Sequence, residues 1–371
     1  MKILIVFGTR PEAIKMGPLI EELRTNDRFD VQVCVTGQHR QMLDQVLDLF
    51  DISPAFDLNL MRPKQSLTQL TCGILQGMED VLKNFKPDWI FVHGDTSTTL
   101  SASLAAYYHQ IKVAHVEAGL RTHDLLSPWP EEANRQITAR LAQLHFTPTQ
   151  QSRENLLNEG VKSDLIHVTG NTVIDALMRI SKRLDNDTKM RHELEDQFSH
   201  IDATKKLVLV TGHRRENFGT NFESMCLALR DIAEQREVQI IYPVHLNPNV
   251  QEPVNRILGS VPNVHLSSPL DYLPFVYLMK RSYCILTDSG GIQEEAPALG
   301  KPVLVMRNTT ERPEAIIAGT AKLIGTDRQN VLGETLSLID DPDSYKKMAC
   351  AHNPYGDGTA CLQIKKILDE L

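Results

Sequence analysis

The sequence predicts an α/β protein made of two doubly wound domains, each with its own parallel sheet. The length of 371 residues suits two domains of ordinary size. Short apolar strands alternate with helical patterns along almost the whole chain, which is typical of this fold class. The strands are nearly continuous apolar runs, as expected when helices cover both faces of a parallel sheet.

The first domain is expected over residues 1–170. Its predicted strands are 2–7, 31–36, 89–93, 112–116 and 144–147, with a short one near 165–168. Helical patterns fill the gaps between them, at 12–24, 39–50, 66–85, 96–108, 131–143 and 150–158. This alternation favours a doubly wound sheet.

The second domain is expected over residues 171–355. A weakly apolar, charge-rich stretch at about 182–204 is expected to be exposed helix plus linker. A second alternating series follows, with strands at 207–211, 238–243, 263–266, 283–287, 302–305 and 321–324. Two such domains are the layout of the GT-B fold, in which the ligand lies in a cleft at the carboxyl ends of both sets of strands. The last helix, within residues 356–371, is expected to cross back to the first domain.

Composition and charge exclude several classes of protein. A formal net charge of -8 argues against nucleic acid or an anionic membrane as a partner, although a small anionic ligand needs only local positive charge. Residues 1–7 indicate a first strand rather than a signal sequence, and no apolar run reaches transmembrane length. A cytoplasmic protein is therefore expected. The six cysteines are scattered, which indicates reduced thiols, and no Cys/His cluster has the spacing of a zinc site.

The most informative segment is 284–306, where an apolar strand leads through Asp-Ser-Gly-Gly into a helix. Ser289 can cap that helix, and Gly290 and Gly291 would let a ligand approach the backbone closely. The free N–H groups of the first turn form an anion site, and Glu295 is placed to accept hydrogen bonds from ribose hydroxyls. The segment therefore suggests a nucleotide-diphosphate site. An ordinary capped turn explains Ser-Gly-Gly alone equally well.

A second anion-binding feature follows the first strand. Arg10 and Lys15 flank the turn and the first turn of the next helix, and Pro11 suits the N1 position of that helix. Two cations beside a helix N-terminus would favour a diphosphate. Ordinary surface charges on a solvated helix start are the alternative.

Three acidic residues are candidates for acid–base chemistry. Asp95 and Glu117 each follow an apolar strand, so they lie at the sheet edge where α/β folds bind ligands. Glu131 begins a helix. Three carboxylates on one edge would repel one another, so at least one should titrate abnormally, as acid–base catalysis requires. Two of them also have a plainer explanation: Asp95 could cap the following helix, and Glu131 could complement a helix dipole. Such an explanation is weaker for Glu117, because no helix pattern follows it.

Basic residues follow the strands of the second domain. His213 ends the first of these strands and, with arginines beside it, could offset the negative charge that builds on a departing pyrophosphate. His245 ends the next strand, and its role is less certain. Arg312 could reach a sugar or a phosphate, although by itself it indicates only a surface arginine.

These motifs belong to a longer series, with Gly-Thr-Arg-Pro-Glu at 8–12 and Trp-Pro-Glu-Glu-Ala-Asn-Arg at 129–135. The series occurs in order and without large gaps, at residues 7–15, 93–96, 115–122, 128–135, 211–216, 284–306, 307–314 and 353–358. Each motif alone is weak, but six or more in register are strong. Over essentially its whole length, the chain resembles the bacterial, non-hydrolysing UDP-N-acetylglucosamine 2-epimerases.

The resemblance implies reversible epimerisation at C2 of UDP-N-acetylglucosamine, giving UDP-N-acetylmannosamine. UDP is eliminated across C1–C2, leaving 2-acetamidoglucal, and then adds back while C2 is protonated from the other face. No nicotinamide is needed, no Gly-x-Gly-x-x-Gly follows the first strand, and no metal is implied, so no cofactor is expected. A homodimer that supplies N-acetylmannosamine units for surface polysaccharide is expected.

The resemblance also implies roles for individual residues. Asp95, Glu117 and Glu131 would form one acid cluster, and His213 would be the fourth catalytic residue. In some relatives Gln stands where this chain has Leu270 in the loop that binds uracil. The substrate-binding residues would be Arg10, Lys15, Asp95, Glu117, His213, Leu270, Phe275, Ser289, Gly290, Gly291, Glu295 and Arg312.

Some relatives hold a second substrate molecule at a helix that opens after the second strand. In this chain an inserted proline changes the spacing of the basic segment that would join it, and a capped amphipathic helix start is the plainer interpretation. The possible allosteric residues are Gln38, Gln41, Lys64, Arg214 and His245.

Three other functions share parts of this pattern. A GT-B glycosyltransferase has the same fold and the same kind of nucleotide-binding site. It also needs an acceptor site, and it would not place so many acids around C2. A hydrolysing epimerase would release free N-acetylmannosamine, and relatives of that type carry Gly-Thr-Arg-Ala-Asp near the start instead of Gly-Thr-Arg-Pro-Glu. A nucleotide-sugar sensor would have no use for the acid cluster.

Overall fold

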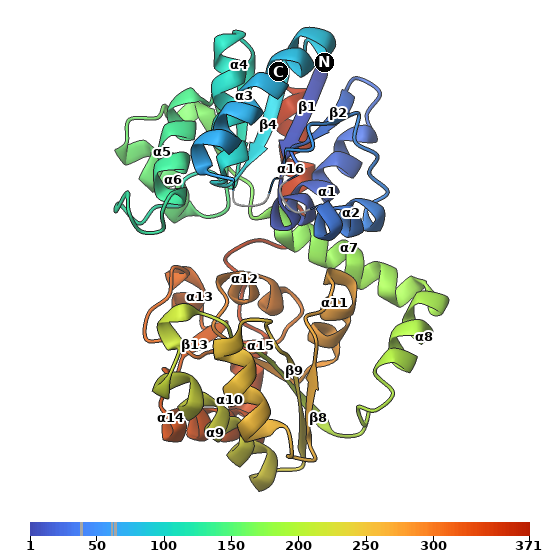
Figure 1. Cartoon of the computed structure of the whole chain (residues 1–371), viewed down its shortest axis with the longest axis vertical. Helices are drawn as coiled ribbons and strands as arrows, with labels where there is room; N and C mark the ends of the chain where they lie inside the picture. The colour runs from blue at the N-terminus through green and yellow to red at the C-terminus, as the bar shows by residue number, and fades with distance from the viewer. Residues whose placement is uncertain (38–39, 61, 63–64) are drawn as a thin grey trace. The chain divides into compact units, whose positions relative to one another are not determined.

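The chain folds into two compact units, each built on one parallel sheet (Figure 1). The computed structural model describes every residue except 38–39, 61 and 63–64, and it describes only the backbone of residues 40–42. Unit 1 comprises Met1–Ala176 and Tyr355–Leu371, and unit 2 comprises Leu177–Pro354. The first division falls after Ala176, a few residues beyond the boundary expected at 170.

Unit 1 contains a seven-stranded sheet in the order β3-β2-β1-β4-β5-β6-β7, and its paired strands are parallel. The strands are β1 (Lys2–Phe7), β2 (Asp30–Val35), β3 (Phe56–Asp57), β4 (Trp89–His93), β5 (Lys112–Val116), β6 (Leu144–Thr147) and β7 (Ile166–Val168). The helices are α1 (Arg10–Arg24), α2 (Arg40–Leu49), α3 (Leu67–Phe85), α4 (Ser97–Tyr108), α5 (Glu131–Leu141), α6 (Gln150–Asn158), the start of α7 (Thr172–Asn186) and α16 (Ala360–Asp369), with a 3-10 turn at Ser163–Leu165.

The first strand shows why this sheet is buried on both faces. Successive side chains of a strand point to opposite faces, and all of residues 3–7 are buried. Leu4 and Val6 pack in one cluster with side chains of α3 and α4. α16, at the red end of the colour scale, lies among the blue N-terminal elements and packs on α1 (Figure 1). Helices on both sides therefore explain the continuous apolar runs of the strands.

Unit 2 contains a six-stranded sheet in the order β10-β9-β8-β11-β12-β13, again with parallel pairs. The strands are β8 (Lys206–Thr211), β9 (Val238–Pro243), β10 (Val264–Ser267), β11 (Cys284–Thr287), β12 (Val303–Val305) and β13 (Ala321–Leu323). The helices are α8 (Thr188–Gln197), α9 (Thr220–Gln235), α10 (Pro248–Leu258), α11 (Tyr272–Arg281), α12 (Gly290–Ala298), α13 (Pro313–Ala318), α14 (Arg328–Asp340) and α15 (Pro342–Ala349), after the end of α7, with a 3-10 turn at Arg215–Asn217.

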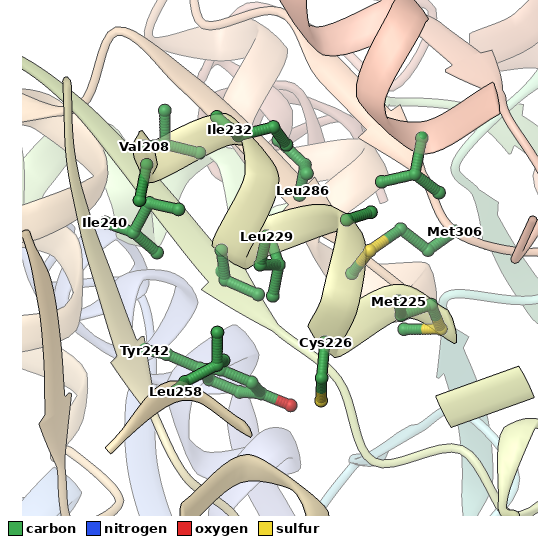
Figure 2. Close-up of a cluster of buried hydrophobic side chains, with 14 of the residues drawn as sticks. Val208, Met225, Cys226, Leu229, Ile232, Ile240, Tyr242, Leu258, Leu286 and Met306 are labelled. Carbon is green, nitrogen blue, oxygen red and sulfur yellow. The ribbon is translucent and has the colours of Figure 1, made fainter. Parts of the chain in front are cut away.

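One hydrophobic cluster joins the helices of unit 2 to its sheet (Figure 2). Leu229 and Ile232 of α9 meet Val208 and Ile240 of the sheet. Tyr242 is also buried there, and its hydroxyl donates to the carbonyl of Gly212 at 2.9 Å. The core of this unit therefore fixes the loop that follows β8.

The predicted fold class is confirmed: the chain has two doubly wound, parallel α/β sheets of the GT-B-like type. Twelve of the thirteen described strands were predicted to within one residue at each end, and β3, only two residues long, was not. Helix α1 begins at Arg10, so Pro11 is the second helical residue instead of the first. The stretch 182–204 is mostly exposed and largely helical, as predicted, but it also contributes buried side chains, among them Leu194 and Phe198.

Candidate functional site

Glu117 lies at the carboxyl edge of the unit 1 sheet, where groups from several elements contact its carboxylate. It follows β5 directly, and its φ of 61° lies in the left-handed region that residues other than glycine adopt rarely. Its carboxylate forms an ion pair with Lys15 of α1. Asn171 Nδ2 donates to the same oxygen, Oε2, at 2.8 Å. His93 Nε2, at the end of β4, lies 3.8 Å from that oxygen.

Asp95 lies between β4 and α4, where several groups act on its charge. The pKa of Asp95 is raised to about 6, mainly by burial; the charges of Glu117 and Glu131 also raise it, whereas the positive charge of Arg135 lowers it. The structure therefore places both Glu117 and Glu131 within electrostatic range of Asp95. The capping explanation for Asp95 is wrong, because Thr96 is the N-cap of α4 and its Oγ1 accepts from the backbone N–H of Thr99 at 3.1 Å.

Helix α5 holds the Asp95 turn from the other side. Asn134 Nδ2 donates to the Asp95 carbonyl at 2.9 Å, and Arg135 Nη1 lies 3.4 Å from the Asp95 carboxylate. Arg135 Nε also donates to Glu132 at 2.6 Å. Glu131 is the first residue of this helix, as predicted.

Glu12 connects the two turns that carry Arg10 and Asp95. One carboxylate oxygen of Glu12 accepts the backbone N–H groups of Gly8 at 3.0 Å and Thr9 at 2.8 Å. The other oxygen accepts Thr96 Oγ1 at 2.7 Å. Glu12 is buried, and burial raises its pKa. The start of α1, with Arg10 as its first residue, is thus tied to the turn after β4.

In unit 2, β11 leads into α12 at Ser289, as the sequence predicted. Ser289 occupies the N-cap position, but its side chain makes no capping hydrogen bond to the helix. Gly290 and Gly291 open the helix, and the nearest atom to a Cβ built on Gly290 is 3.9 Å away. That atom is Nη2 of Arg214, so the backbone N–H groups of the first turn lie beside a guanidinium group, and both favour an anion. Glu295, one turn later, is buried and accepts from Tyr272 Oη at 3.2 Å.

His213 stacks on His245 with the ring centroids 5.2 Å apart. Burial lowers the pKa of His213, the charge of Asp288 raises it, and His245 and Arg214 lower it further. The imidazole is thus biased toward its neutral form. Asp288, which is fully buried, accepts the backbone N–H groups of His213 at 2.9 Å and Arg214 at 2.8 Å through Oδ2.

The remaining predicted residues of unit 2 lie near α11 and α12. Arg312 forms an ion pair with the buried Glu294, so the plain surface-arginine interpretation is wrong. Leu270 lies in the loop before α11, as expected, whereas Phe275 lies within that helix because α11 already begins at Tyr272.

The predicted second substrate site is described only in part. Gln38 and Lys64 lie outside the described residues, and Gln41 belongs to α2 but its side chain is not described. Arg214 and His245 lie with His213 after β8 and β9.

The described part of the chain lacks two kinds of feature. No group of three or more His, Cys, Asp or Glu side chains within it is arranged to hold a metal ion. None of its helices is both long and apolar enough to cross a membrane.

Several residues of the site were not singled out from the sequence. Asn171, Arg135 and Glu12 contact the predicted acids or their turns from distant parts of the chain. Asp288 could have been found, because it begins the Asp-Ser-Gly-Gly segment at the end of a strand. Asn171 gives no local signal, because its partner Glu117 is 54 residues away. Glu12 and Arg135 lie within the motifs at 8–12 and 129–135, but a local pattern does not show their contacts with the Asp95 turn, which span 84 and 40 residues.

Comparison with known proteins gives one consistent result. A family model described as UDP-N-acetylglucosamine 2-epimerase matches residues 21–369. Proteins named UDP-N-acetylglucosamine 2-epimerase from Yersinia pestis and Escherichia coli K12 are 61% and 60% identical to this chain, over 99% of it and 98% of each of them. The crystal structure of a Neisseria meningitidis UDP-GlcNAc 2-epimerase bound to UDP-GlcNAc is similar over 100% of both chains, with 53% identity and a TM-score of 0.92.

Proposed function

The chain belongs to the UDP-N-acetylglucosamine 2-epimerase family, and we propose that it interconverts UDP-N-acetylglucosamine and UDP-N-acetylmannosamine without hydrolysis. The observation that carries the proposal is the acid cluster of unit 1, where Asp95 has a pKa of about 6 and lies within electrostatic range of Glu117 and Glu131. A carboxyl group that titrates near neutral pH can take up and return a proton in one cycle.

Unit 2 supplies the groups that would hold UDP. The N–H groups at the start of α12 favour a pyrophosphate, because the positive end of a helix dipole and unsatisfied donors point to the same place. Glu295 would accept hydrogen bonds from the ribose hydroxyls, and its contact with Tyr272 fixes its position. Leu270 and Phe275 would lie against the uracil ring.

The elimination step needs a base for the proton on C2 and stabilisation of the leaving group. The C2 proton moves to a carboxylate, the C2–H electron pair becomes the C1=C2 double bond, and the C1–O pair leaves with UDP. His213, neutral before the step, would donate a hydrogen bond to the pyrophosphate as its charge grows. Arg10, Lys15 and Arg312 would add positive charge.

In the addition step the C1–O and C2–H bonds form again, but the new C2–H bond is on the opposite face of the ring. An oxygen of the UDP β-phosphate attacks C1 of 2-acetamidoglucal, and C2 receives a proton from an acid on the opposite face. Inversion therefore needs two proton-carrying groups, and Asp95, Glu117 and Glu131 provide three candidates.

Turnover in deuterated water tests this function. We expect UDP-N-acetylglucosamine incubated with the protein to become a mixture with UDP-N-acetylmannosamine, with deuterium at C2 of the product by NMR. Small amounts of UDP and 2-acetamidoglucal should accumulate over long incubations. Fully retained protium at C2 would exclude the mechanism, and stoichiometric free sugar would indicate a hydrolysing enzyme.

Two further expectations belong to the same proposal. The protein would act as a homodimer, which light scattering can measure. Its product would supply N-acetylmannosamine for surface polysaccharide, which labelled sugar precursors could trace.

A further inference from the structure

Asn171 is a buried amide at the start of α7, and its hydrogen bonds with Tyr355, Val173 and Glu117 lie within unit 1. Its backbone N–H donates to the Tyr355 carbonyl at 2.8 Å. Its side-chain Oδ1 accepts the backbone N–H of Val173 at 3.2 Å, which caps the first turn of α7. Its Nδ2 donates to Glu117 Oε2 at 2.8 Å.

The capping contact decides which end of the amide faces the acid. Because Oδ1 accepts from the helix, Nδ2 must point the other way, toward Glu117. Lys15 reaches the same carboxylate oxygen, so two donors from different elements hold Oε2. The carboxylate therefore has one fixed orientation although the backbone of Glu117 is in a strained conformation.

We propose that Asn171 is a positioning residue for the epimerase reaction, which orients the Glu117 carboxylate and favours its ionised form. The inference rests on the proposed role of Glu117 in proton transfer at C2. A neutral donor is suited to this task, since it stabilises the carboxylate without adding a charge that would be lost or gained with pH.

Other charged or titratable groups also face Glu117. Lys15 approaches from α1, His93 from the end of β4, and Asp95 from the following turn. Burial lowers the pKa of His93 to about 4, so His93 is neutral at the pH of the assay. Near neutral pH, Asp95, with a pKa of about 6, is therefore the group among these whose change of charge acts on Glu117.

Two substitutions separate positioning from capping. Asn171→Ser and Asn171→Asp both keep an oxygen at the N-cap, and both remove the amide Nδ2 that donates to Glu117. Asn171→Asp also places a second carboxylate beside Glu117, which should raise the pKa of Glu117. Asp327→Ser is the matched control, because Asp327 caps α14 in unit 2 through the same i+2 contact, at 3.0 Å.

The first readout is the titration of Glu117 in the ligand-free protein, followed by carbon-13 NMR of its carboxyl group. Asn171→Asp should move the midpoint up by about one pH unit or more, and Asp327→Ser should leave it unchanged. This measurement needs no substrate, so it tests the inference even if the proposed epimerase activity fails. An unchanged midpoint in Asn171→Asp would overturn the inference.

The second readout is turnover of UDP-N-acetylglucosamine. Asn171→Ser should lower kcat about 10- to 100-fold and change KM by less than about threefold, as expected when an interaction with a charged group that matters in the transition state is lost. A kcat within about twofold of the unchanged protein, or an equal loss in Asp327→Ser, would show that Asn171 only caps its helix. If the unchanged protein does not exchange deuterium at C2, the proposed function itself is wrong.

Discussion

At the scale of the residue, Glu117 has a strained φ and a carboxylate that Lys15 and Asn171 hold. Glu117→Gln keeps the size of the side chain and removes its ability to take a proton. We expect UDP binding to persist and epimerisation to fall about 10²- to 10⁴-fold, the usual contribution of a positioned acid or base. Calorimetric titration with UDP and an NMR assay of C2 inversion measure the two effects. Turnover near that of the unchanged protein would contradict the proposed role.

Asp95 is expected to make the stability of the protein depend on pH. Its pKa is raised from 3.8 to about 6, mainly by burial, so folding favours the protonated form. The contribution of protonated Asp95 to the free energy of unfolding is complete below pH 3.8 and is lost as the pH rises through about 6.

Asp95→Asn removes this titration. We therefore expect the substitution to raise the free energy of unfolding at pH 8 by on the order of 1–3 kcal/mol, and the difference should largely vanish near pH 4. Urea unfolding at the two pH values checks this. An equal difference at both would mean that Asp95 titrates normally.

At the scale of the element, the first turn of α12 contains a glycine, Gly290, that we expect to matter for binding UDP and not for folding. A Cβ on Gly290 would meet no atom within 3.9 Å, so the protein itself has room for a side chain. We expect Gly290→Ala to leave Tm unchanged or slightly raised, because alanine favours helix, and to weaken UDP binding by about tenfold or more.

Gly333→Ala is the control for that change. Gly333 lies in α14, and a Cβ there meets nothing within 4 Å. The substitution should raise Tm by a similar or larger amount and leave UDP binding unchanged in calorimetry. Equal UDP affinity in both variants would mean that ligands do not approach the backbone of α12 at Gly290.

The elements also show what the sequence could predict. The strands were predictable because each is a buried apolar run, and Phe56–Asp57 was not because two residues carry no periodic pattern. Asp95 and Glu117 could be chosen because parallel strands end at one edge. Asn171 could not, since its contact with Glu117 spans 54 residues and depends on how β5 and β7 are ordered in the sheet.

At the scale of the whole molecule, the division into two compact units predicts that a substitution in one unit destabilises that unit and not the other. Asp175, which is buried in α7, accepts the backbone N–H groups of Ala360 at 3.2 Å and Cys361 at 2.9 Å and so holds the start of α16. Asp175→Ala leaves these N–H groups without their acceptor. We expect it to destabilise unit 1 by about 1–3 kcal/mol.

Hydrogen exchange measured by mass spectrometry can locate that loss. Faster exchange should appear in unit 1, above all in α1 and α16, and the strands of unit 2 should be unchanged. Asp327→Ala, which removes the cap of α14, should have the opposite distribution. A uniform increase across both units after Asp175→Ala would show that the two units unfold as one.

The return of the last helix to unit 1 has a consequence for synthesis. Residues 355–371 belong to unit 1, where Lys365 contacts Glu22 and Thr25 and Asn26 contacts Asp369. A ribosome makes residues 177–354 before these, so a nascent chain halted at 354 would hold all of unit 2 and an unfinished unit 1. The groups proposed to bind the nucleotide would then mature before those proposed to move the proton.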